Sequence, residues 1–151
     1  RGLGDVYKRQ AHNNAQTGLM GTYDANNVYF TIDGKTAYGY GATTLFTFSY
    51  DNNLLSVQQD PQGTGTASIN NKTGGTFTLT INQMSPFNKI IDDLADERRV
   101  GGYAVDACDG SRHYVGAHAY IQKKPDGGAA NEAGERTITV KVLNVVENSV
   151  L

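Results

Sequence analysis

Few residues of this 151-residue chain have the types and spacing that catalysis or metal binding requires. His113 and His118 stand five positions apart in a segment that alternates like a β-strand, and an odd spacing places them on opposite faces. They are therefore not expected to bind one metal ion together. Cys108 is the only cysteine, which excludes an internal disulfide and a multi-cysteine zinc site. Because no base stands beside it in sequence, we expect Cys108 to pack as a small hydrophobe.

The acidic and glycine-rich segments also lack a complete motif. Asp106 and Asp109 surround Cys108 near a predicted turn, but Asp-x-x-Asp-Gly lacks the ligand series of a calcium-binding loop. The segments at residues 39–44 and 63–66 lack the Gly-Lys-Thr/Ser ending of a phosphate-binding loop. We therefore predict no catalytic site, no metal and no cofactor. A hydrolase that combines Asp106 with the two strand histidines is the alternative.

Composition describes a polar, turn-rich chain with little charge. Charged residues make up 19% and the net charge is −2, so the chain is neither a coiled coil nor a charged disordered tail. Its length suits one domain, and it has no stretch of 18 apolar residues that could span a membrane. Basic residues form no stripe, so specific binding of nucleic acid is not predicted.

The first nineteen residues differ from the rest. Residues 1–19 have neither apolar periodicity nor the core of a signal peptide, and residues 1–10 resemble a translated sequencing-adapter fragment. A coherent pattern begins at Met20. We interpret residues 1–19 as a non-native or disordered extension and residues 20–151 as a single domain. This domain contains 10 Lys and Arg and 14 Asp and Glu, for a net charge of −4.

Alternation of apolar and polar residues predicts β-strand for most of the domain. The clearest strand covers residues 76–82, in which Phe77, Leu79 and Ile81 are expected to face a core. The polar positions between them are expected to face water or a partner; they are Thr76, Thr78 and Thr80. Similar patterns and turn dipeptides predict further strands at residues 28–32, 35–40, 43–50, 54–59, 103–108, 112–122 and 137–146.

One segment has the period of a helix instead. Ser85 suits the N-cap and Pro86 the first helical position. The helix is expected to place Arg98 and Arg99 in its last turn and to end at residues 101–102, both glycine. The apolar positions that follow Pro86 at i, i+3, i+4 and i+7 form one stripe toward the core, made of Phe87, Ile90, Ile91 and Leu94.

Residues 58–75 are almost wholly polar, with Ile69 as the only large apolar side chain. A segment so long and polar within a compact domain is usually functional or mobile, and we interpret it as a long projecting loop or hairpin. With seven or eight strands and one helix, the sequence predicts a mainly β fold, an antiparallel two-sheet sandwich or barrel with one flanking α-helix. These features favour a binding or assembly module over an enzyme.

Three segments also resemble a known family. They are YDANNV at residues 23–28, GTFTLTINQMSPFN at residues 75–88 with the helix after it, and GAHAYIQKKPD at residues 116–126. In this order and spacing they resemble the inner tail tube proteins of contractile-tailed, myovirus-type bacteriophages. The resemblance covers about residues 20–146.

The resemblance implies a structural virion protein. Such subunits form homo-hexameric rings that stack into a tube, and their inner sheets join into a barrel around a channel through which double-stranded DNA passes without specific binding. The partners implied are the tail sheath, the baseplate or initiator and the tape-measure protein, with no membrane. The location implied is the phage tail, assembled in the bacterial host cytoplasm. A related contractile injection device would share these features.

Two groups of residues receive roles from this resemblance. Thr76, Thr78 and Thr80 would form a polar face that lines the channel or an interface, where a neutral or acidic surface lets DNA slide. The polar loop would bridge one ring to the next through Gln58, Asp60, Pro61, Gly63, Gly65, Asn70, Asn71 and Lys72. We expect it to become ordered on stacking.

A function of another class is a carbohydrate-binding β-sandwich module of a tail fibre or a secreted protein. Its nine tyrosines could stack on sugar rings, but the chain has no tryptophan and no evident exposed aromatic pair.

Overall fold

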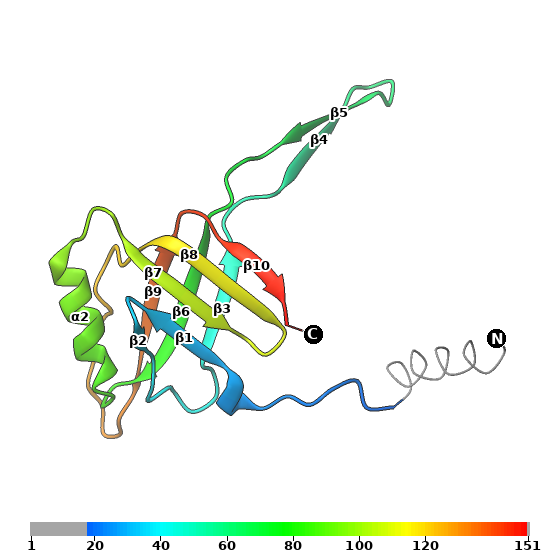
Figure 1. Cartoon of the computed structure of the whole chain (residues 1–151). Coiled ribbons are helices and arrows are strands. Elements are labelled where there is room, and N and C mark those ends of the chain that lie inside the picture. The colour runs from blue at the N-terminus through cyan, green and yellow to red at the C-terminus, as the bar shows by residue number, and fades with distance from the viewer. Residues whose placement is uncertain (1–17, 151) are drawn as a thin grey trace.

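The computed structural model describes residues 18–150, which form ten β-strands, one α-helix and one short 3-10 helix, η1 (Ala25–Asn27) (Figure 1). The extension predicted over residues 1–19 lies outside this range except for its last two residues. The mainly β fold class is confirmed. The strands are β1 (Tyr29–Ile32), β2 (Lys35–Thr36), β3 (Phe46–Tyr50), β4 (Leu55–Gln59), β5 (Gly65–Ile69), β6 (Gly75–Asn82), β7 (Tyr103–Cys108), β8 (Arg112–Tyr120), β9 (Glu135–Val142) and β10 (Val146–Ser149).

All strand pairs are antiparallel. Seven strands follow the order β2-β1-β7-β8-β9-β6-β3, β10 pairs with β8, and β4 and β5 form a separate sheet. The path turns at β8, which meets β9 only through Ala119 with Val142 and Tyr120 with Lys141. The strands therefore form two layers that face each other, β2-β1-β7-β8-β10 and β9-β6-β3 (Figure 1).

The hydrophobic core lies between these layers. Phe77, Leu79 and Ile81 of β6 are buried, as their alternation predicts. Phe30 of β1 crosses the core to Phe77, with ring centroids 5.2 Å apart in an edge-to-face contact. The other strand residues that are fully buried in this core are Ile32, Val105, Ala107, Ala119, Ile138, Val140 and Val142.

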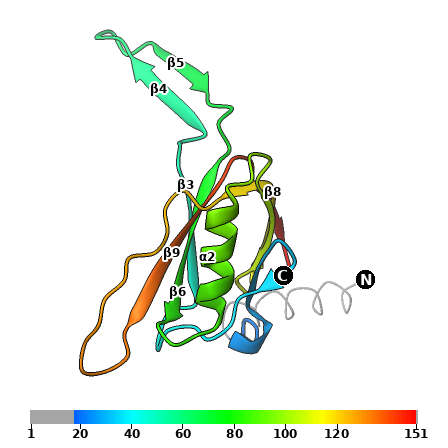
Figure 2. The ribbon, with the colours of Figure 1, turned by 90° about the vertical axis from the view of Figure 1, so that its left-hand side faces the viewer.

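Helix α2 (Phe87–Glu97) lies against one side of the two layers (Figure 2). It buries Phe87, Ile91 and Leu94, while Ile90 is half-buried against the core. The helix begins one residue later than predicted, with Pro86 and not Ser85 at the N-cap. The Ser85 hydroxyl still contacts the first turn, because it donates to the carbonyl of Tyr38 at 2.8 Å and accepts the N–H of Phe87 at 3.3 Å. Within residues 18–150, no helix has the length and apolarity needed to cross a membrane.

The end of α2 differs from the prediction. The helix stops at Glu97, and Arg98 adopts the left-handed conformation with φ 51° and ψ 48°, so neither Arg98 nor Arg99 belongs to the last turn. Arg99 instead bridges Glu97 at 2.8 Å and Asp33 at 3.2 Å, and its guanidinium lies over the ring of Tyr103. These tertiary contacts fix the chain direction before Gly102 is reached.

Strand β8 also departs from strict alternation. Alternation predicts Val115 and Ala119 on one face and Tyr114 on the other, but Tyr114 and Ala119 are both buried while Val115 is exposed. The pairing of β7 with β8 shifts by one residue between Tyr103 and Val105, and such a β-bulge changes the face presented beyond it.

The two strands that exceed the predicted count are β5 and β10. The strand predicted at residues 137–146 is confirmed over residues 137–142 and wrong beyond them: β9 begins at Glu135 and ends at Val142, and the chain then turns to pair β10 with β8. The predicted return strand at residues 35–40 is also shorter, because only Lys35 and Thr36 pair with β1.

Candidate assembly surface

The polar segment is a hairpin that projects away from the two layers (Figures 1 and 2). Of the residues selected from sequence, Gln58 lies in β4 and Gly65 in β5, while Asp60, Pro61 and Gly63 form the turn. Three more lie on the return to the body; they are Asn70, Asn71 and Lys72. Every residue of both hairpin strands is exposed, so this element has no contact with the core.

The turn of the hairpin is built around Asp60. Its Oδ1 accepts the backbone N–H groups of Gln62 and Thr64, both at 2.9 Å, and its own backbone N–H donates to the carbonyl of Thr64. Gly63 has φ 91°, a conformation that other residues rarely adopt. The tip is thus a defined turn that holds one carboxylate at its end.

The two faces of the hairpin have different chemistry. Leu55 pairs with Ile69 and Val57 with Ala67, so these four side chains lie on one face, which we call the hairpin strip. The exposed fractions of Leu55, Val57 and Ile69 are 54%, 68% and 76%. The opposite face carries short polar side chains from Ser56, Gln58, Thr66 and Ser68. Sequence reasoning missed the strip because it counted Ile69 alone and did not pair 54–59 with 65–69.

The root of the hairpin is held by polar contacts. Asp51 follows β3, and its carboxylate pairs with Lys141 of β9 and accepts the hydroxyl of Thr76 at 2.9 Å. The hydrogen bond from Lys141 lowers the pKa of the Asp51 carboxyl below its ordinary 3.8. On the returning strand, the Thr73 hydroxyl donates to Asn144 Oδ1 at 2.9 Å. Both arms of the hairpin are therefore fastened to the body.

A second surface is the outer face of the layer β9-β6-β3. Thr76, Thr78 and Thr80 lie on it, half-buried, on the side of β6 opposite the core. The pairing register brings further hydroxyl groups beside them, because Thr78 lies between Thr47 and Thr139, and Thr80 lies opposite Thr137. We call this the hydroxyl face; it consists of Thr47, Ser49, Thr76, Thr78, Thr80, Thr137 and Thr139. These seven side chains are short and uncharged. The same side of the layer also carries Lys141, opposite Thr76 and paired with Asp51, and Glu135, opposite Asn82.

The structure brings two of the three residues of the hydrolase alternative together. His113 Nε2 contacts Asp106 Oδ1, and the Tyr29 hydroxyl lies 3.4 Å from the same oxygen. His118 bonds instead to the carbonyl of Gly101. Cys108 is half-buried rather than buried, and it lies across from His113 in the register. Among residues 18–150 no hydrogen bond joins Cys108 to an imidazole, as an activated thiol nucleophile requires, and no group of His, Cys, Asp and Glu is suited to a metal.

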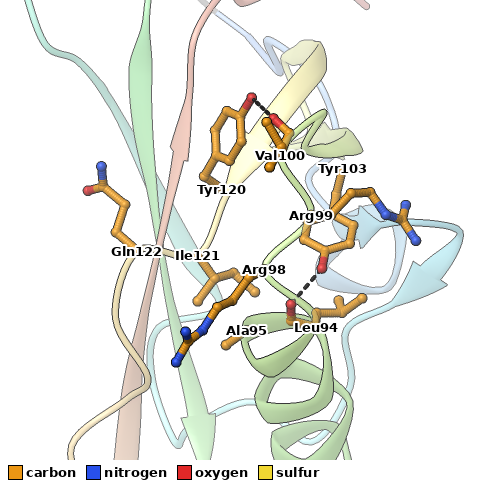
Figure 3. A pocket seen from close by; sticks show the side chains of 9 residues that line it. All are labelled: Leu94, Ala95, Arg98, Arg99, Val100, Tyr103, Tyr120, Ile121 and Gln122. Carbon is orange, nitrogen blue, oxygen red and sulfur yellow. Dashed lines mark hydrogen bonds between the residues drawn. The ribbon is translucent and has the colours of Figure 1, made fainter.

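A pocket of about 550 Å³ lies between the end of α2 and the end of β8. Figure 3 shows Arg98 beside Ile121, with the hydroxyl of Tyr120 bonded to the carbonyl of Val100 and that of Tyr103 to the carbonyl of Leu94. No Asp, Glu, His or Cys lines it. The hydroxyls of Tyr103 and Tyr120 line it, but both donate to backbone carbonyls.

The aromatic residues do not form a sugar-stacking platform. Tyr23, Tyr38 and Tyr50 are the exposed tyrosines of the described residues, and no ring contact joins any two of them there. The Tyr50 hydroxyl is tied to β10 by its hydrogen bond to Glu147. Burial and this hydrogen bond raise the pKa of Tyr50 to about 12.

Solved structures provide the decisive likeness. A chain from the cryo-EM structure of the anti-feeding prophage cap, the AFP tube terminating cap, has a TM-score of 0.56 at 10% identity, covering 87% of this chain and 94% of that one. The chain shares its fold with components of contractile injection systems. A chain from the PVC sheath-tube complex in the extended state has a TM-score of 0.58 at 12% identity, covering 90% and 97%.

A third likeness is to a chain from the PVC sheath/tube terminator in the extended state, with a TM-score of 0.51 at 10% identity, covering 85% and 97%. No family model and no curated protein matches the sequence. The likeness is therefore one of fold and of nearly complete length, reached by sequences that differ at about nine positions in ten.

Proposed function

We propose that this chain is a structural tube subunit of a contractile phage tail or a related contractile injection device, assembling as stacked hexameric rings. The observation that carries this proposal is the projecting hairpin on a fold shared, over nearly its full length, with components of contractile sheath–tube assemblies. A hairpin that is exposed on every residue and carries an apolar strip has no role within its own subunit. It therefore suits a contact with a neighbouring ring.

The hydroxyl face suits the surface that lines the channel. DNA has about one negative charge per 1.7 Å of its axis, so a lysine-rich lumen would hold it by many phosphate contacts. Seven short hydroxyl side chains on three adjacent strands offer hydrogen bonds without this charge. In the phage form of the assembly, we propose that DNA slides past this face without specific binding, and that the chain has no enzymatic activity.

The assembly would place the chain in the virion, with the sheath around the tube and a baseplate or initiator at one end. A tape-measure protein would lie inside the tube while it assembles in the bacterial cytoplasm. A tube-terminating role is the second candidate, because two of the similar structures described above are a tube terminating cap and a sheath/tube terminator. The two roles differ in stacking, since a tube subunit adds ring upon ring, whereas a terminator stops after one.

Electron microscopy and sedimentation velocity of the full chain test the proposal. We expect rings and, as the concentration rises, tubes of stacked rings. Replacing residues 54–70 by a short Gly-Ser turn should leave the subunit folded and able to form rings but prevent stacking. Single rings that never stack in the unaltered chain would favour the terminator. A monomer at every soluble concentration, or glycan binding by that monomer, would contradict the assembly role.

A further inference from the structure

We propose that the hairpin docks on the opposite end of a second copy of this chain, with Asp60 of the tip paired to Arg136 of that copy. This inference rests on the proposed function and names the acceptor of its inter-ring contact. The partner is identified by charge and by the positions of exposed apolar groups at the two ends of one subunit.

The hairpin presents a single charge. Between residues 52 and 71 the only charged side chain is that of Asp60. Its Oδ1 is used by the turn, whereas Oδ2 has no hydrogen bond and no cation within the described range. The carboxylate therefore stands at the end of the projection with one oxygen available to a partner.

The acceptor is a pocket of about 360 Å³ at the other end of the body, lined by Gln83, Arg136 and the loop that precedes β9. Arg136 lies opposite Ile81 at the start of β9, on the core-facing side of the strand. Its Nε is buried and lacks a hydrogen-bond partner, and the side chain makes no ion pair in residues 18–150. A buried guanidinium nitrogen without a partner is rare, and a planar, five-donor group is suited to a carboxylate.

The acids beside Arg136 are already engaged. Glu135 accepts the backbone N–H of Ala42 at 2.8 Å, and Asp126 pairs with Lys123 at 3.3 Å. The wall of the pocket is fixed by Gln83, whose amide donates to Gly128 at 3.1 Å and accepts from Gly134 at 3.0 Å. Glu135, like Arg136, makes no ion pair within residues 18–150, but its Oε1 is held by the N–H of Ala42, and Arg136 is the one cation that lines this pocket.

Apolar groups accompany the charge at both ends. At one end, the hairpin carries its apolar strip. At the other end, Met84 in the turn between β6 and α2 is 77% exposed, and Tyr38 is 46% exposed. Met84 follows Gln83 of the pocket wall, and the carbonyl of Tyr38 accepts the hydroxyl of Ser85. Tyr38 and Met84 therefore expose apolar groups at the end of the body that carries the pocket.

The two ends point in opposite directions. Gly75 pairs with Val142 at the hairpin root, and Asn82 pairs with Glu135 at the acceptor end, so seven residues, or about 24 Å of strand, separate them. Figure 2 shows the hairpin and the loop before β9 at opposite ends of the body. Contacts between unlike ends propagate along a line, which is the geometry of stacking and not of a closed pair.

The area of this contact suits a repeated interaction. The strip is about 17 Å long and one hairpin wide, on the order of 200 Å², far below the roughly 800 Å² per partner of a stable dimer. Two free subunits are therefore not expected to associate through it. A ring presents several such contacts at once. Once one contact has formed, the other hairpins of the ring are held close to their acceptors at a high effective concentration.

Charge reversal in the full chain tests the pairing. Asp60→Arg and Arg136→Glu are each expected to lower the stacked fraction, measured by sedimentation velocity and electron microscopy, about tenfold at the concentration where the unaltered chain is half stacked. The double variant should restore stacking. Arg136→Met should also weaken stacking but should not respond to Asp60→Arg. Asp93→Arg, an equal reversal on the exposed face of α2, is the matched control and should leave stacking unchanged.

The outcomes separate this pairing from the proposed function. If the hairpin replacement prevents stacking while Asp60→Arg stacks normally, the acceptor is wrong and the tube role stands. If Arg136→Glu fails to fold, the stacked fraction of Arg136→Met is compared with that of Arg136→Met combined with Asp60→Arg. If Asp60→Arg lowers stacking as much in the Arg136→Met background as in the unaltered chain, the two side chains act independently and the pairing is overturned. If the unaltered chain never stacks at any soluble concentration, both the pairing and the tube subunit role are overturned.

Discussion

Single side chains decide how the hairpin is held and where α2 ends. Asp51 joins the first arm of the hairpin to β9 through Lys141 and to β6 through Thr76. Arg98 turns the chain in a left-handed conformation that is costly for a residue with a Cβ, and the contacts of Arg99 hold the chain there. These roles of Asp51 and Arg99 could not be recognised from sequence, because Lys141 lies 90 residues from Asp51 and Asp33 lies 66 residues from Arg99.

Asp51→Asn should lower the free energy of unfolding by about 1 kcal/mol at neutral pH, since the pair is partly exposed and water screens it. The pKa of Asp51 is lowered in the folded state, so the contribution of the pair is present above the unfolded pKa and disappears as the pH falls through the folded pKa. The difference between variant and parent in urea unfolding should therefore vanish below the ordinary carboxyl range. A constant difference down to pH 2 would contradict this assignment.

At the scale of the elements, alternation and capping residues predicted most of the architecture. Strand β6, the helix stripe and the turns near Asp33 and Asp109 follow from local patterns. The β8 bulge, the strand β10 and the register of β4 with β5 depend on pairing between distant segments. The strip became visible only through this register, because Leu55 and Ile69 lie fourteen positions apart in sequence and side by side in space.

Ile91→Ala should destabilise the subunit by roughly 2–5 kcal/mol, the cost of a cavity at a fully buried isoleucine. Ile90→Ala is the matched control, because Ile90 is only half-buried on the same helix and should lose distinctly less. Chemical denaturation of the two variants measures this difference. Equal losses would mean that α2 does not direct Ile91 into the core in solution.

The whole molecule is a closed core with two outward surfaces, and these surfaces explain part of its composition. Part of the glycine, threonine and asparagine that is frequent in the sequence lies at the hairpin turn, on its root and on the hydroxyl face. The subunit also keeps part of its apolar surface, the strip, outside its own core. A subunit of this kind completes its burial by contact with copies of itself.

Thiol labelling of assembled tubes locates the hydroxyl face. In a Cys108→Ala background, Thr78→Cys should react with a small maleimide both in free subunits and in tubes, because small molecules diffuse along a channel. A polyethylene-glycol maleimide of several kilodaltons should react with the free subunit but not with the tube. Asp93→Cys on the exposed side of α2 is the control and should react with both reagents in both states.

Each alternative arrangement gives its own labelling pattern. Reaction of Thr78→Cys in tubes with the large reagent would place the hydroxyl face on the outside of the tube and contradict a luminal role. Protection from both reagents would place it within a subunit interface, where seven hydroxyl groups would then have to be paired by a neighbour. Only the size-dependent pattern agrees with a neutral face turned toward an open channel, where short side chains without charge allow DNA to pass.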